Sequence, residues 1–171
     1  MSGTILLSVG RLLGYPECCI REFVSRNPSQ GDPVLSTYKT EGRISWYVNV
    51  SLLSFDWALI THVPCSPRCE RSLELAYGAY RVLFEGSLQL AQQMTLALAT
   101  HVLHTEYFGV LAFRGSPEPH GWRIGSILLA QPGSVLEKVV CSGDCLTLDN
   151  EGVCIGNMFI EDRSARVLWF C

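Results

Sequence analysis

The hydrophobic pattern divides the chain near residue 105 into a helical first part and an extended second part. In residues 16–26 (PECCIREFVSR) the apolar side chains fall on one stripe at helical spacing. A longer helical pattern starts at residue 66 and continues to about residue 104, with a break at residues 86–87, where a glycine precedes a serine. The first part of the chain is therefore predicted to be mainly helical.

Two stretches of the first part are less regular. Residues 27–33 (NPSQGDP) combine two prolines with a glycine, a composition typical of a loop. Between residues 46 and 60, Phe55, Trp57 and Leu59 alternate as in a strand, but the longer apolar run is equally compatible with a buried helix. The pattern leaves both interpretations open there.

Beyond residue 105, short apolar runs separated by glycine and turn residues predict strands. One of them, LTLDNEGVCI, has the pattern of a hairpin with its turn at residues 149–152. The predicted fold is α+β: N-terminal helices that carry the cysteine motifs, followed by a small antiparallel β-sheet. We expect a single domain over residues 1–171, with a mainly helical half at 1–105 and a β-rich half at 106–171. The predicted strands lie at residues 106–114, 122–131, 135–140, 146–155 (the hairpin) and 167–170.

The composition limits the partners and the compartment. Of the 171 residues 48% are hydrophobic, so the chain can bury a core without help from disulfides or metal. A net charge of −3 and a pI near 5.8 provide no basic surface, so we expect neither nucleic acid nor an anionic membrane as the main partner. The first ten residues lack the features of a signal peptide, and no apolar run is long enough for a membrane span. These features predict a cytoplasmic protein.

Eight cysteines change this picture because most of them are clustered. Disulfide frameworks belong to small secreted domains with poor cores, so clustered thiols in a reducing compartment indicate metal or redox chemistry instead. Cys154 and Cys171 stand alone, and since free cysteine is commonly buried we assign them structural roles. The eight cysteines lie at positions 18, 19, 65, 69, 141, 145, 154 and 171.

Two of the clusters coincide with predicted helix starts. Proline is favoured at the first helical position, where its missing N–H would have no partner in any case. Pro16 at this position puts Cys18 and Cys19 at the third and fourth helical positions, and Pro67 puts Cys69 at the third. The free N–H groups and the dipole of a helix N-terminus favour negative charge and lower the pKa of a thiol. Both motifs are therefore predicted to present thiolates.

The two motifs could form one site. If the two helix starts face each other, three or four thiolates meet at one point. Adjacent residues point about 100° apart on a helix, so we expect only one member of the Cys18–Cys19 pair to face this site directly. The other member would then pack in the core. On the second motif, Cys65 lies just before the predicted helix cap at Ser66.

The same residues carry a family resemblance. GYPECC at residues 14–19 and HVPCSPRC at residues 62–69 resemble a family of poorly characterised microbial proteins. Its signature is Gly-Tyr-Pro-x-Cys-Cys with a downstream His-x-Pro-Cys-Ser-x-x-Cys, and the likeness covers roughly residues 11–76. The resemblance implies one unit with a cysteine-bound metal or cluster. This unit comprises Gly14, Tyr15, Pro16, Cys18, Cys19, His62, Pro64, Cys65, Ser66 and Cys69.

Three or four thiolates suit either zinc or an iron–sulfur cluster. The motifs lie about 45 residues apart, unlike the closely spaced ligands of a compact zinc knuckle, and this separation favours a cluster held between elements of the fold. We therefore expect an iron–sulfur cluster of the 4Fe-4S type, with zinc as the alternative. The fourth ligand could also be His62 or an exogenous group. The expected ligands are Cys18, Cys19, Cys65 and Cys69.

These ligands predict a small metalloenzyme whose cluster binds or activates a small-molecule substrate by redox, sulfur-transfer or lyase-type chemistry. His62 and Glu17 are the candidate catalytic residues. His62 could carry a proton. Glu17 could act as a base, although an acid in the first helical turn also suits the helix dipole. The alternative is a binding or accessory module, in which zinc or the cluster stiffens a scaffold for a protein partner.

Three further features of the sequence contain cysteine or histidine residues that could take part in chemistry. Cys141 and Cys145 flank a glycine-containing turn and could add two ligands, form a redox pair or lie on a buried sheet face. His101 and His104 lie three positions apart and fit a hydrated helix end better than a metal site. His120 has proline and glycine neighbours in GSPEPHGW, which predicts an exposed turn.

Overall fold

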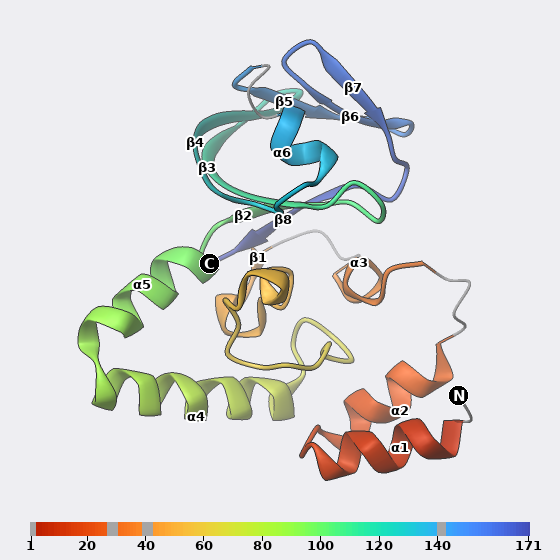
Figure 1. Cartoon of the computed structure of the whole chain (residues 1–171), viewed down its shortest axis with the longest axis vertical. Helices are drawn as coiled ribbons and strands as arrows, with labels where there is room; N and C mark the ends of the chain where they lie inside the picture. Colours follow the sequence, from red (N-terminus) through yellow and green to blue (C-terminus); the bar gives the residue numbers. More distant parts are fainter. Residues whose placement is uncertain (1–2, 27–30, 39–42, 140–142) are drawn as a thin grey trace.

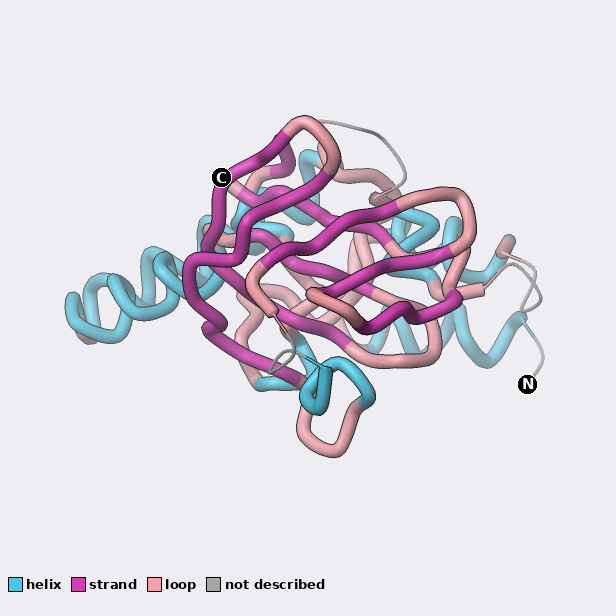
Figure 2. The backbone as a smooth tube through the Cα atoms, turned by 90° about the horizontal axis from the view of Figure 1, so that it is seen from above, coloured by secondary structure: helices cyan, strands magenta, loops and turns pink. Residues whose placement is uncertain are grey.

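Helices precede an eight-stranded sheet, and the α+β class predicted from the sequence is confirmed. The computed structural model describes residues 3–26, 31–38, 43–139 and 143–171. In Figure 1 the sheet occupies the upper part of the molecule and curls around the short helix α6 (Val135–Val139), while the other helices lie below it. Seen from above, the strands cover the helices that extend to both sides (Figure 2).

The helices vary from short turns to a 17-residue helix. The predicted helix over residues 16–26 and the predicted break at residues 86–87 are both confirmed. The helix at the start of the described chain was not predicted. The helices before the sheet are α1 (Gly3–Leu12), α2 (Glu17–Ser25), α3 (Pro33–Thr37), α4 (Glu70–Gly86) and α5 (Leu88–Leu98), with 3₁₀ turns η2 (Trp46–Val48) and η3 (Leu53–Phe55).

All neighbouring strands pair antiparallel except β1 and β8, which are parallel. The order across the sheet is β1-β8-β2-β3-β4-β5-β6-β7, and the hairpin predicted around residues 149–152 joins β5 to β6. The last strand returns to pair with both β1 and β2, so it ties the segment around residues 43–44 to the sheet. The strands are β1 (Arg43–Ile44), β2 (His101–His104), β3 (Val110–Glu118), β4 (Gly121–Ala130), β5 (Cys145–Leu148), β6 (Gly152–Ile155), β7 (Met158–Glu161) and β8 (Arg166–Phe170).

Two hydrophobic clusters form the core. One joins α5 to β2, β3 and β8 and contains Leu98, Val102 and Phe170, all almost fully buried. The other lies on the concave side of the curled sheet, where Leu136 of α6 packs with Phe113 and the strands beyond it. Each cluster buries apolar side chains from several elements, which is the main source of stability in such a fold.

Three predictions of secondary structure were wrong. Residues 46–60 form neither a strand nor a helix, but the turns η2 and η3 joined by irregular backbone. The predicted long helix ends at Leu98, and residues 101–104 form the central strand β2 between β3 and β8. Residues 135–139 form α6 rather than a strand, because a five-residue apolar segment fits either structure and tertiary packing decides. In the predicted loop, residues 27–30 lie outside the described residues, and Pro33 begins α3.

Helices α1 and α2 form a hairpin at the lower edge of the molecule (Figure 1). Gly14 has a φ of +74° at the turn between them, a conformation that disfavours other residues. Gly10 allows close packing, because a Cβ there would lie 2.8 Å from a side-chain carbon of Ile20. The hairpin thereby brings the first turn of α2 towards the beginning of α4.

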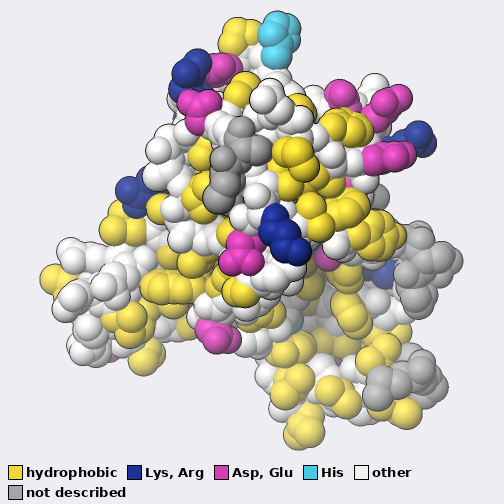
Figure 3. Space-filling model, turned by 45° about the horizontal axis from the view of Figure 1, so that its top comes forward, with side chains coloured by type: hydrophobic (Ala, Val, Ile, Leu, Met, Phe, Trp, Pro, Cys, Tyr) yellow, Lys and Arg dark blue, Asp and Glu magenta, His cyan; other side chains and the backbone are white. Residues whose placement is uncertain are grey.

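Hydrophobic side chains are exposed over the lower, helical part of the face shown in Figure 3, whereas most of the charged side chains on this face lie higher, over the sheet, and form no large basic patch. The most exposed apolar side chains of the helices include Leu12, Val82 and Leu96. Within the described part of the chain, no helix combines the length and the apolar character that crossing a membrane requires.

Candidate metal centre

Four thiols from two distant segments meet at one point. The sulfur atoms of Cys18, Cys19, Cys65 and Cys69 all lie within 4.8 Å of one another. Sγ of Cys69 is 3.7 Å from that of Cys18 and 3.6 Å from that of Cys19, and the two adjacent cysteines are 3.9 Å apart. This group could bind a metal ion, because thiolates are ligands for zinc and for iron.

The start of α2 supplies two of the thiols. Pro16 is the N-cap rather than the first helical residue, so Cys18 and Cys19 lie in the first turn, one position earlier than predicted. The Pro16 carbonyl accepts hydrogen bonds from the amides of Cys19 and Ile20 and closes this turn. Both cysteines belong to the group, and the expectation that only one of them would face it was wrong.

The other two thiols lie on the segment before α4. The predicted helix start at Ser66-Pro67 was wrong, because the helix begins at Glu70 with Cys69 as its N-cap. A turn in which the Cys69 amide donates to the Ser66 carbonyl folds this segment back, and the Cys65 amide donates to Cys19 Sγ at 3.3 Å. An amide that points at a sulfur favours the thiolate form of that sulfur.

Ser72 and His62 extend the group by hydrogen bonds. The Ser72 hydroxyl is 3.3 Å from Cys19 Sγ and 2.9 Å from Nε2 of His62, whose ring is buried and packs 5.1 Å from that of Tyr15. Burial lowers the pKa of His62. His62 therefore reaches the thiols through Ser72, and its predicted catalytic role stays a prediction. Sequence reasoning missed Ser72, although its position three residues after Cys69 places it on the same helix face.

The thiols differ in acidity. Burial raises the pKa of Cys19 to about 11. The pKa of Cys65 is raised further, first by burial, then by its hydrogen bond with Cys69 and by repulsion from neighbouring thiols. Burial also acts against ionisation of Cys69, but interactions with Ser72 and with the thiols of Cys65 and Cys19 outweigh it and lower the pKa of Cys69 to about 7. Of these three thiols, Cys69 thus loses its proton easily while Cys19 and Cys65 do not, as expected for several acidic groups in contact.

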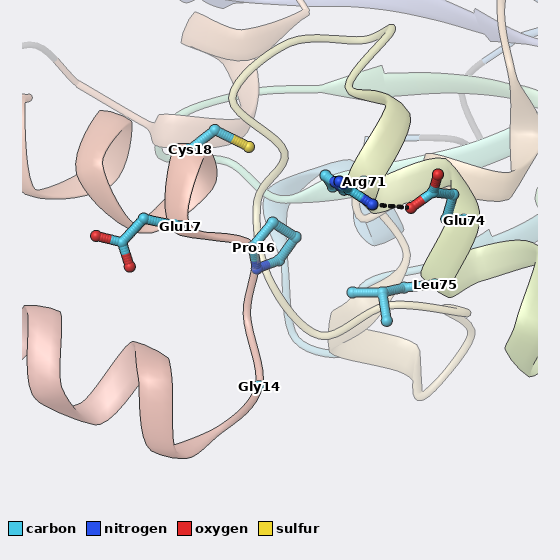
Figure 4. A pocket seen from close by; sticks show the side chains of 7 residues that line it. All are labelled: Gly14, Pro16, Glu17, Cys18, Arg71, Glu74 and Leu75. Atoms are coloured by element: carbon cyan, nitrogen blue, oxygen red, sulfur yellow. Dashed lines mark hydrogen bonds and ion pairs between the residues drawn. The ribbon is translucent and has the colours of Figure 1, made fainter.

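Cys18 connects the group to an open cleft of about 590 Å³ between the start of α2 and α4. Figure 4 shows its sulfur pointing towards Arg71, which pairs with Glu74 at 2.9 Å, while the Glu17 side chain points away. Glu17 is hydrogen-bonded to Arg11 and Arg21, which lower its pKa to about 2. A carboxylate with so low a pKa is a weak base, so these contacts weaken the predicted catalytic role of Glu17.

The other three cysteines of the described ranges lie apart from this group. Cys171 was expected to be buried but is exposed, and Cys154 is half-buried in β6. Cys145 is exposed at the beginning of β5, and Cys141 lies outside the described residues. None of the seven cysteines in the described ranges forms a disulfide.

The three other histidines also lie elsewhere. His101 and His104 are on a strand and not at a helix end: His101 packs among the rings of Phe113, Trp122 and Trp169, and His104 is buried. His120 is exposed in the turn between β3 and β4, as predicted.

The fold and the site define an α+β protein with a four-cysteine group suited to metal. The chain is 33% identical over 108 residues to an uncharacterized protein of Methanothermobacter thermautotrophicus, and the alignment covers 59% of this chain and 55% of the relative. The chain thus spans about half the length of this curated relative. No family model and no solved structure matches the chain.

Removing either thiol of the second motif should abolish metal binding, since each is in contact with the others. We expect Cys65→Ala and Cys69→Ala each to lower the metal content of the chain to near zero. Elemental analysis of the purified full chain measures this, with Cys171→Ala as the exposed control that keeps its metal. Full metal content in both of the first two variants would contradict the four-thiol site.

The thiols of metal-free protein should titrate in separate steps. Because the pKa of Cys69 is lowered to about 7, its thiolate should form as the pH rises through about 7, well before Cys19 ionises near pH 11. The ultraviolet absorbance of the thiolate measures both steps, and Cys69→Ala should remove the first one. The prediction fails if no thiol of the folded protein ionises below the ordinary value of about 8.5.

Proposed function

We propose that the four thiolates bind a single metal ion, with zinc preferred, and that this ion stabilises a small-molecule binding module. The observation that carries this proposal is the separation of the sulfur atoms, which is 3.6–3.9 Å for the three pairs formed by Cys18, Cys19 and Cys69. Four sulfurs around one tetrahedral ion, with bonds of about 2.3 Å, lie roughly 3.8 Å apart. The observed spacing supports one ion at the centre of the group.

The same spacing argues against the four-iron cluster favoured by the sequence. In such a cluster each thiolate binds an iron of its own, so the thiolates lie on the outside of the cluster and further apart than around one ion. With all four sulfurs within 4.8 Å, the group leaves little room for four irons and their sulfides. Zinc, the alternative from the sequence, fits without rearrangement of either segment.

A closed set of four thiolates is typical of a structural zinc site. Here the ion would link α2 to the residues before α4, and therefore the α1–α2 hairpin to the rest of the protein. Apart from the thiols, the hairpin and the residue after it make few polar contacts with the other described residues: Tyr15 bonds to Thr61, and Arg26 bonds to the carbonyl of Pro33 and to α3. The ion would thus stabilise the attachment of the α1–α2 hairpin to the rest of the protein, to which apolar packing also contributes.

The small-molecule part of the proposal rests on the cleft beside Cys18. The cleft is open, one wall carries a ligand thiolate, and Arg71 on the opposite wall supplies a cationic group (Figure 4). We place this module in a reducing compartment such as the cytoplasm, where the free thiols would stay reduced. The partial resemblance of the two motifs to a microbial family with a cysteine signature agrees with a shared metal site.

An enzyme is the second candidate, and the exposure of Cys18 favours it. A metal-bound thiolate keeps nucleophilic character, and Cys18 is the one thiol of the four that is exposed to solvent. Sulfur-transfer or redox chemistry on a substrate in the cleft would then use Cys18 directly. A purely structural site does not need an exposed ligand.

Metal analysis of protein purified without oxygen distinguishes a zinc site from an iron–sulfur cluster. The expected result is about one zinc per chain, no acid-labile sulfide and a colourless protein. Brown protein that contains iron and sulfide in equal amounts would instead establish the iron–sulfur cluster and overturn the single-ion proposal.

Removal of the metal should loosen the hairpin selectively. We expect amide exchange in α1 and α2 to accelerate by at least about tenfold after chelation, because the ion binds only the closed arrangement. Exchange in β2 and β3, which belong to the apolar cores, should change little. Hydrogen exchange with mass spectrometry measures both regions in one sample. Equal acceleration in the hairpin and in the sheet would show that the ion does not act at this attachment.

A further inference from the structure

Cys18 is the accessible member of the four-cysteine group. It is exposed and lines the open cleft of about 590 Å³ between the start of α2 and α4. Cys19 and Cys69 are buried, Cys65 is half-buried, and none of these three lines the cleft. A small molecule that enters the cleft therefore meets the sulfur of Cys18 before any other sulfur of the group (Figure 4).

The sulfur of Cys18 also lacks the hydrogen bonds that stabilise its neighbour. Within the described part of the chain, no amide or hydroxyl donates to Cys18 Sγ, whose contacts are with other sulfur atoms. Cys19 Sγ accepts a hydrogen bond from the Cys65 amide and lies 3.3 Å from the Ser72 hydroxyl. Such donors stabilise a thiolate and thereby make it less nucleophilic. Cys18 thus combines access from solvent with an unstabilised sulfur.

Cys69 is placed to react with an oxidised Cys18. Their sulfur atoms are 3.7 Å apart. A disulfide bond is about 2.05 Å long, so the two atoms need to approach each other by only about 1.7 Å. Cys19 is nearly as close to Cys18, at 3.9 Å, but the two residues are adjacent. Adjacent Cα atoms are about 3.8 Å apart, less than the minimum of about 4.4 Å usual for a disulfide, so this pairing is strained.

The charge around Cys18 favours a small uncharged oxidant. Four thiolates around one divalent ion leave a net negative charge at this wall of the cleft. The one described cation of the lining, Arg71, is already paired with Glu74 at 2.9 Å. An anionic oxidant is therefore repelled, whereas an uncharged one is not. Peroxides are small and uncharged, and they oxidise accessible thiolates that have a second thiol nearby.

We propose that Cys18 is a peroxide-reactive site and that its oxidation ends in a disulfide with Cys69 that displaces the metal ion. The Cys18 thiolate first attacks one oxygen of hydrogen peroxide. An S–O bond forms, the O–O bond breaks and hydroxide leaves, so the sulfur loses two electrons and becomes a sulfenic acid. The Cys69 thiolate then attacks this sulfur: the S–S bond forms, the S–O bond breaks and a second hydroxide leaves.

The disulfide acts on the group in a reversible way. It removes two of the four ligands, and the two thiols that remain hold a metal ion far more weakly. This loss of metal rests on the proposed single-ion site, whereas the disulfide requires only the two thiols. Because the bond joins the start of α2 to the cap of α4, as the ion does, the α1–α2 hairpin keeps its place. Reduction of the bond therefore restores the four-thiol group.

Addition of hydrogen peroxide to the full zinc-loaded chain tests this assignment. We expect zinc to be released, as measured with a chromophoric chelator, while a Cys18–Cys69 disulfide appears in the peptide map. A thiol reductant and added zinc should then restore the metal content. A different main disulfide within the group, or release of zinc by irreversible oxidation alone, would overturn the proposal.

Oxidised glutathione tests the class of the oxidant. This molecule is larger and anionic, so it should release zinc at least about tenfold more slowly than hydrogen peroxide at the same concentration. Equal or faster release would overturn the assignment to a peroxide.

Two variants locate the reactive sulfur. Cys18→Ser should slow disulfide formation in the group by about tenfold or more, because the accessible thiolate is gone. The peptide map reads this result whether or not the variant holds zinc. Cys171→Ala lacks an exposed thiol outside the group and is the matched control, which should react like the unchanged chain. An unchanged rate in Cys18→Ser would refute the assignment.

Failure of the metal proposal is distinguishable from failure of this one. If the reduced chain contains no zinc, the single-ion site and its release are contradicted, while the peptide map still decides the reaction between Cys18 and Cys69. If the chain contains zinc but peroxide yields no Cys18–Cys69 disulfide, the metal site stands and the peroxide-reactive site is refuted.

Discussion

The contact between four thiols is the interaction on which the helical part of the molecule depends. It joins Cys19 and Cys69, which are 50 residues apart in sequence, and fixes the first turn of α2 against the cap of α4. Neither helix start has an ordinary side-chain cap, since no side-chain hydrogen bond caps α2 or α4. At α4 the cap residue is Cys69 itself, so a sulfur atom takes the place of the usual capping oxygen. Both helix dipoles therefore point their positive ends at the same group of thiols.

Ionisation of all four thiols in this group would require a cation. Several thiolates within 4.8 Å repel one another, so in the metal-free chain ionisation of Cys69 raises the cost of ionising Cys65. Amide and hydroxyl donors offset only part of this repulsion, and a divalent ion at the centre offsets the rest. The group also has an inner and an outer side: Cys19 and Cys69 are buried, and Cys18 borders the cleft. A bound ion would therefore have two buried ligands, Cys19 and Cys69, and one ligand, Cys18, that faces solvent.

The sequence predicted the α+β class, the helix at residues 16–26 and the grouping of Cys18, Cys19, Cys65 and Cys69, because proline and cysteine spacing are local signals. The predicted helix starts were wrong by one residue at α2 and by three at α4. The contacts among the sulfur atoms, rather than the preference of proline for the first helical position, set the backbone around Cys65 and Cys69. The sequence also missed β2, since continuation of a helical pattern cannot reveal a strand that is paired on both sides. Long-range pairing decides such segments.

The short helix α3 contacts both the segment that precedes Cys65 and the strand β2. At its C-terminal end the Thr37 hydroxyl donates to the carbonyl of Pro64, the residue before Cys65. At its N-terminal end the cap Asp32 is bonded to His104 on β2. The segment that carries Cys65 and the central part of the sheet are therefore joined through packed elements, and α3 contacts both of them.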